Sequence, residues 1–135
     1  MDETLREAFR ETSYLVNLDA VTWATIRIDL PLPLELVPVV GSRPWAFITA
    51  WNPQARRRAH AENMAAQREL LTALQGLPDV ALRPAIGVGS TGWSEPSLFV
   101  AGPDLATLDA LARQHGQRAY VHGQADGAAR LRWME

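Results

Sequence analysis

The sequence predicts an α+β fold with a ferredoxin-like split β-α-β-β-α-β core over about residues 44–122, an N-terminal helix and extra edge strands. The first observation behind this is an apolar run at 44–51 that leads directly into a long helical pattern. The second is a pair of strand-like runs joined by a Gly-rich turn, followed by another helical pattern and another strand. A chain of 135 residues has the usual size of one domain, so we expect a single domain over residues 1–135.

Each core element carries its own signal. The first helical pattern, N-P-Q-A-R-R-R-A-H and onward, follows an Asn-Pro start and stops at Gly76 and Pro78. The second places Leu105, Leu108 and Leu111 on one stripe and stops at Gly116. The predicted core elements are a strand at 44–51, a helix at 52–76, strands at 80–89 and 96–102, a helix at 103–116 and a strand at 118–122.

Three further segments lie outside this core. Residues 3–13 place Leu5, Ala8, Phe9 and Thr12 on one face of a short amphipathic helix. Residues 24–30 alternate apolar and polar side chains, and 129–134 also resembles a strand, so both are expected to extend the sheet. The segment 31–44 contains four prolines, which predicts an extended crossing loop or an edge segment.

Composition excludes several classes of protein. With 47% hydrophobic and 21% charged residues the chain is typical of a globular domain, and a net charge of -2 disfavours nucleic acid as a partner. There is no cysteine, so disulfides, thiolate metal sites and cysteine nucleophiles are excluded. No apolar leader opens the sequence and no stretch of 18 apolar residues occurs, so we expect a cytoplasmic location and no membrane partner.

The predicted topology places two motifs at one edge of the sheet. Strands 44–51 and 96–102 should be antiparallel neighbours, with 80–89 beside the latter. The segment T-A-W-N-P at 49–53 then lies beside W-S-E-P-S at 93–97. A functional site is expected at this edge, formed by residues 51–53 and 92–97.

Polar and aromatic residues of this edge are the candidate site residues. Asn52 before Pro53 is typical of a helix start, and the alternative is that this helix start binds an anion with Arg56 to Arg58 nearby. Asn63 falls on the predicted buried face of the helix, where its amide either fixes the Pro-rich loop or a strand end, or contacts a ligand. Glu95 lies between Trp93 and Pro96, where it either supports the turn, pairs with an arginine, or has a raised pKa suited to general acid or base chemistry. The predicted ligand-binding residues are Trp51, Asn52, Asn63, Trp93, Ser97 and Gln117, and the predicted catalytic residue is Glu95.

Two apparent motifs carry little weight. G-V-G-S-T-G at 87–92 matches a dinucleotide fingerprint, but a strand rather than a helix is predicted to follow it. The three histidines lack the spacing of a metal site. We therefore expect no cofactor and no metal.

The set T-A-W-N-P (49–53), E-N (62–63), W-S-E-P-S (93–97) and H-G-Q-R-A (115–119) resembles the uncharacterised bacterial domain-of-unknown-function family 3293, over about residues 12–122. The resemblance implies a compact cytoplasmic bacterial domain and brings no assigned activity or catalytic residues. The chain departs from the family pattern mainly in the Pro-rich segment 31–44.

Three functional hypotheses follow. The favoured one is a non-enzymatic ligand-binding, partner-binding or regulatory module that uses the edge at 51–53 and 92–97, with a small anionic ligand or a protein as partner. The second is an enzyme that acts on a small anionic substrate with Glu95 as general acid or base. The third is a structural or assembly role through a sheet edge, as in a homodimer.

Overall fold

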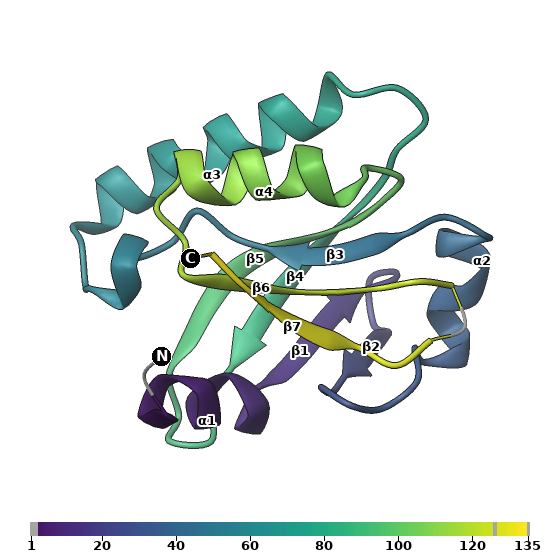
Figure 1. Ribbon diagram of the computed structural model, residues 1–135, viewed down its shortest axis with the longest axis horizontal. Helices are drawn as coiled ribbons and strands as arrows, with labels where there is room; N and C mark the ends of the chain where they lie inside the picture. Colours follow the sequence, from purple (N-terminus) through teal and green to yellow (C-terminus); the bar gives the residue numbers. More distant parts are fainter. Residues whose placement is uncertain (1–2, 126, 135) are drawn as a thin grey trace.

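A seven-stranded antiparallel sheet organises residues 3–125 and 127–134, which the computed structural model describes (Figure 1). Its strand order is β2-β1-β4-β5-β3-β6-β7. The strands are β1 Ser13–Asn17, β2 Trp23–Ile26, β3 Trp45–Ile48, β4 Ala81–Val88, β5 Ser94–Ala101, β6 Ala119–Gly123 and β7 Arg130–Trp133. The α-helices among these residues are α1 Glu3–Glu11, α2 Val37–Val40, α3 His60–Gln75 and α4 Leu105–Gln114, with short 3-10 turns at Leu34–Leu36 and Pro53–Ala55. The predicted α+β class is confirmed.

The strand pairing at the centre of the sheet is as predicted. β3 and β5 are antiparallel neighbours with Phe47 opposite Phe99, and β4 pairs with the other side of β5. Ile48 lies opposite Leu98, so the end of β3 meets the beginning of β5. The Thr49 hydroxyl donates to the Pro96 carbonyl over 2.8 Å, which joins the two motif segments directly.

Side chains alternate between two cores on the two faces of the sheet. Both faces of β3 are covered, because Trp45 and Phe47 face one core and Ala46 and Ile48 face the other. The core that contains Ala46 and Ile48, here called the outer core, packs beneath α3 and α4, which lie side by side over one face of the sheet (Figure 1). The core on the other face, here called the inner core, is filled by aromatic rings, including the stacked pair of Trp45 and Phe99 with ring centroids 5.6 Å apart.

The sheet curls until its two ends touch. Ile28, just after β2, forms a bridge with Ala129, just before β7, and Pro31 forms another with Ala128. Asp29 N–H donates to the Ala129 carbonyl and Ala129 N–H donates to the Leu30 carbonyl, each over 2.9 Å. The concave face is therefore enclosed, as in the interior of a small barrel.

A partly buried ionic cluster joins α4 to β7. Asp109 is 7% exposed and accepts two bonds from Arg132, at 2.8 and 2.7 Å. The Tyr120 hydroxyl donates to the same carboxylate over 2.7 Å. These charge-assisted bonds, above all those from Arg132, lower the pKa of Asp109 to about 2.

The long helix begins later than predicted. It starts at His60, and residues 53–55 form a separate 3-10 turn. Asn52 has a positive φ of 45°, and its side chain makes no capping bond. The Asn-Pro pair therefore does not start the helix, and the free N–H groups predicted at Pro53 are not there.

The N-terminal third differs from expectation in three places. Residues 13–17 form β1, which pairs with both β2 and β4 and was not predicted. The predicted strand at 24–30 is shorter, because β2 ends at Ile26 and Asp29 has a φ of 74°. The Pro-rich segment 31–44 contains two short helical turns, which bury Leu36 and Val40 in the inner core.

Replacing Asp109 by Asn should destabilise the protein by about 1 to 3 kcal/mol at pH 7, because the charge-assisted bonds are lost while Arg132 stays in place. Since the pKa of Asp109 is lowered in the folded state, its contribution is present at neutral pH and is lost as pH falls from about 4 toward 2. Urea unfolding at several pH values measures this. Asp79→Asn, at an exposed residue 3.7 Å from Arg43, is the control and should change stability by less than about 0.5 kcal/mol. Equal effects of the two substitutions would show that Asp109 is not a structural anchor.

Candidate functional site

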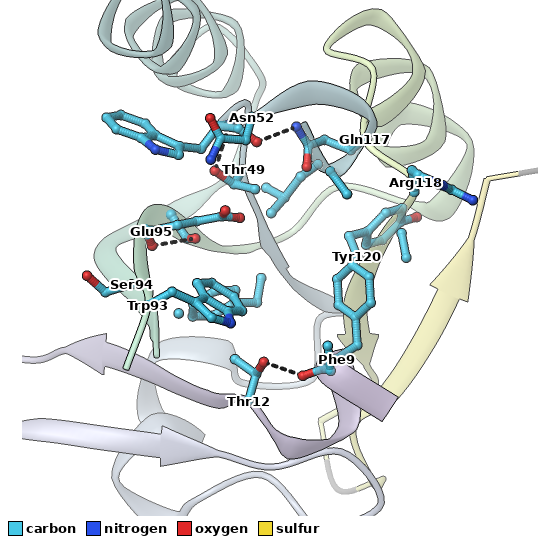
Figure 2. A pocket seen from close by; sticks show the side chains of 18 of the residues that line it. Phe9, Thr12, Thr49, Asn52, Trp93, Ser94, Glu95, Gln117, Arg118 and Tyr120 are labelled. Carbon is cyan, nitrogen blue, oxygen red and sulfur yellow. Dashed lines mark hydrogen bonds between the residues drawn. The ribbon is translucent and has the colours of Figure 1, made fainter. Parts of the chain in front are cut away.

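A cavity of about 510 Å³ opens at one end of the concave face (Figure 2). Its walls come from α1, from β1, β4 and β5, from residues 51–58, and from residues 117–121. All seven site residues predicted from the sequence line it: Trp51, Asn52, Asn63, Trp93, Glu95, Ser97 and Gln117. Cavities of this volume accommodate small organic molecules.

A missing side chain on β4 helps to form the cavity. Gly87 lies between Tyr14 of β1 and Glu95 of β5 in the register of the sheet, so all three positions face the same side. A Cβ atom at Gly87 would approach nothing closer than Thr12 Cγ2 at 3.8 Å and Phe47 Cε1 at 4.0 Å. The glycine therefore leaves room between a phenol and a carboxyl group.

Glu95 is the chemically unusual residue of the cavity. Its carboxyl group makes no hydrogen bond or ion pair with any residue in the described ranges 3–125 and 127–134. Burial raises its pKa from 4.5 to about 7, because desolvation penalises the charged form. Among the described residues Glu95 has neither a turn-capping bond nor an arginine partner, the two structural roles considered from the sequence. A carboxyl with this pKa exchanges protons readily near neutral pH.

Asn63 fixes the segment that carries Trp51. It is 2% exposed, its Oδ1 accepts from Asn52 N–H over 2.8 Å, and its Nδ2 donates to Asn52 Oδ1 over 2.7 Å. Arg58 joins this cluster, because its Nε donates to Asn63 Oδ1 and its Nη2 donates to the Ala50 carbonyl. The amide of Asn63 thus holds the segment that follows the end of β3, which fits the strand-end alternative and not the Pro-rich loop, and Asn63 also borders the cavity.

The remaining predicted residues hold the cavity wall in place. Gln117 donates through Nε2 to the Trp51 carbonyl over 3.1 Å, which connects the wall after α4 to the loop after β3 (Figure 2). Ser97 is buried and donates to the Glu95 carbonyl oxygen over 3.3 Å. The indole ring of Trp93, with its Nε1 atom foremost, occupies the space where Gly89 would carry a Cβ. Trp93 therefore borders the cavity and is 42% exposed.

Several cavity residues were not among the sequence candidates. Tyr14 donates to the Phe9 carbonyl over 2.6 Å, and burial raises its pKa. Phe9 belongs to the predicted apolar stripe of α1, which borders the cavity instead of being buried in the core. Arg57 and Arg118 also line the cavity; in the sequence, Arg57 was noted only as part of the arginine run and Arg118 only within the motif H-G-Q-R-A. The stripe on α1 was the available signal, since a short helix with an apolar face must cover something.

Within the described part of the chain no group of histidine and acidic residues could hold a metal ion. No helix described there is long and apolar enough to cross a membrane.

Comparisons with known proteins give one match. A family model described as "Protein of unknown function (DUF3293)" matches residues 48–120, a range that contains all seven predicted site residues. No curated protein and no solved structure matches the chain.

Replacing Glu95 by Gln should stabilise the protein at pH 8 by roughly 1 to 3 kcal/mol, because the folded state no longer holds an unpaired charge. The pKa of Glu95 is raised in the folded state, so the penalty is absent below pH 4.5, grows as pH rises, and is complete above about 7. The gain should therefore vanish near pH 4. Urea unfolding at both pH values measures it, provided the m-values agree. Glu35→Gln at an exposed position is the control, and a loss of stability for Glu95→Gln at pH 8 would show that the carboxylate supports the fold.

Proposed function

The chain belongs to the DUF3293 family of proteins of unknown function, and we propose that it is a ligand-binding or regulatory module that binds a small molecule in the cavity beneath α1. The site extends the edge formed by residues 51–53 and 92–97 to the inside of the curled sheet. The observation that carries the proposal is the Glu95 carboxyl, which borders the cavity without a partner among the described residues.

An unpaired carboxyl in a cavity costs stability. Folded proteins pair buried charges, because desolvation without compensation is unfavourable. Perturbed carboxyl groups in cavities are typical of binding and catalytic sites. A ligand that donates a hydrogen bond to Glu95 would supply the interaction that the protein leaves open.

The shape and lining of the cavity support the same proposal. Aromatic rings of Phe9, Tyr14 and Trp51 provide apolar walls, and a few polar groups lie among them. Such a combination is typical of small-molecule sites, where apolar surface contributes affinity and a few polar groups orient the ligand. Asn63 accepts from Asn52 N–H and Gln117 donates to the Trp51 carbonyl, and these two bonds hold the wall in position before a ligand arrives.

An enzyme is the second candidate, and the pKa of Glu95 favours it. A carboxyl whose pKa is about 7 transfers protons efficiently near neutral pH. Glu95→Gln keeps the shape of the site and removes its proton transfer. Once a ligand has been identified, an enzyme should lose turnover of this ligand in the Glu95→Gln variant, whereas a binding module should still bind it.

The arrangement of the core is part of the proposal. We propose that β3 to β6, with α3 and α4, form a ferredoxin-like unit to which β1, β2 and β7 are added. The strand order β4-β5-β3-β6 and the position of both helices on one face support this.

Filling the cavity should abolish ligand binding. Gly87→Val places a β-branched side chain on a strand, in space that nothing occupies within 3.8 Å of its Cβ, so the fold should be retained. We expect native wild-type protein to bind the aromatic fluorophore anilinonaphthalene sulfonate saturably, and Gly87→Val to lose this binding at unchanged or higher urea resistance. Fluorescence titration measures binding, and urea unfolding verifies the fold. Equal binding by both proteins, or none by wild type, would contradict a ligand site in this cavity.

A further inference from the structure

We infer that the ligand of this cavity is a small organic acid, with its acidic group against Arg57 and Arg118 and its apolar body between the aromatic walls. This inference rests on the proposed function and deepens it, because it names the chemical class that the site selects.

The charges around the cavity favour an anion. Three arginine residues line it, Arg57, Arg58 and Arg118, and Glu95 is the only acidic residue among the described residues that line it. Burial keeps this carboxyl partly neutral near pH 7 and so reduces its opposition to an anion. A recess with an excess of positive charge and apolar walls concentrates the field on a bound anion.

The guanidinium groups divide into one that the protein uses and two that it leaves available. Arg58 is engaged, because it donates to Asn63 Oδ1 over 3.0 Å and to the Ala50 carbonyl over 3.1 Å. The side chains of Arg57 and Arg118 make no hydrogen bond or ion pair with the residues described in the structure. Arginine forms paired hydrogen bonds with carboxylate, sulfonate and phosphate oxygens, so these two groups suit the acidic end of a ligand.

The polar groups also give the ligand a direction. Glu95 and Arg118 lie on opposite sides of the cavity, with Tyr120 nearer to Arg118, and the nitrogen end of the Arg118 side chain points away from Glu95 (Figure 2). A ligand whose acid lies toward Arg118 therefore keeps its negative charge away from Glu95. Its other end reaches Glu95, where a hydroxyl or N–H group would donate to the unpaired carboxyl oxygen.

The alternative explanation is that Arg57 and Arg118 are simply solvated. Arg57 is exposed, and exposed arginines need no partner. Arg56 provides a matched comparison, because it is exposed and adjacent in the chain but does not line the cavity. Substitutions at the two positions separate a ligand contact from general surface charge.

Two fluorescent probes that differ by one group test the inference. Anilinonaphthalene sulfonate carries an acidic group, and its parent phenylnaphthylamine has the same rings and N–H without the sulfonate. We expect wild type to bind the sulfonate at least about fivefold more tightly, a difference of roughly 1 kcal/mol. Arg57→Ala and Arg118→Ala together should remove this preference while leaving phenylnaphthylamine affinity within about twofold, because only the acid contacts the guanidinium groups.

The outcomes distinguish this inference from the proposed function. Binding of both probes with equal affinity, lost in Gly87→Val, would retain the cavity as a ligand site and overturn the assignment to organic acids. Binding of neither probe would overturn the proposed function itself. Arg56→Ala should leave the affinity for the sulfonate within about twofold of wild type, and an effect as large as that of Arg57→Ala would show that only surface charge matters. Urea unfolding of each variant verifies that the fold is intact.

Discussion

The closure of the sheet at residues 28–31 and 128–129 is the constraint on which the site depends. Backbone bonds from Asp29 and Ala129 hold the two ends of a seven-stranded sheet together, so the concave face becomes an interior. Aromatic side chains, with Trp45 and Phe99 stacked, fill much of that interior. At the end nearest α1, Gly87 contributes no side chain, and a cavity remains there.

The 51–58 segment completes the cavity at the expense of local strain. Asn52, Gln54 and Ala55 have positive φ values of 45°, 59° and 57°, a conformation that costs about 1 kcal/mol or more for residues other than glycine. The strain is offset by bonds from outside the segment, including Gln54 N–H to the Gly116 carbonyl over 2.7 Å. Gly116 has a φ of 64°, and a Cβ there would lie 2.9 Å from Pro53. This close approach connects the wall after α4 to the wall after β3, which are the two sides that Gln117 also bridges.

Much of the fold could be predicted from the spacing of apolar residues and from glycine and proline stop signals, because those signals are local in the sequence. The alternation of apolar residues and the stops at Gly76 and Gly116 predicted the central strands and both long helices. The start of α3 was wrong because Asn52 and Pro53 are typical of a helix start, whereas the side chain of Asn52 is bound by Asn63 and Arg58. β1 was missed because its five residues are stabilised by neighbours distant in the sequence, β2 and β4.

The candidate site, like the fold, could be predicted only where the sequence signal was local. The edge at 51–53 and 92–97 was predictable, because the order of elements places β3 and β5 together. The other half of the cavity was not, because Tyr14 and the stripe on α1 reach it only through the curl of the sheet. The role of Gly87 was also hidden, since a glycine in a strand has no local signal that tells a bulge from an empty space beside a ligand.

The most direct test of the account is the ionisation of Glu95 in the folded protein. Carbon-13 NMR of the glutamate side-chain carboxyl groups, compared between wild type and Glu95→Gln, assigns its signal and follows it through a pH titration. We expect a midpoint of about 7, because the carboxyl is desolvated and has no partner among the described residues. A midpoint at or below 4.5 would contradict it, because the carboxylate would then be solvated or paired and the cavity would contain no unsatisfied acid.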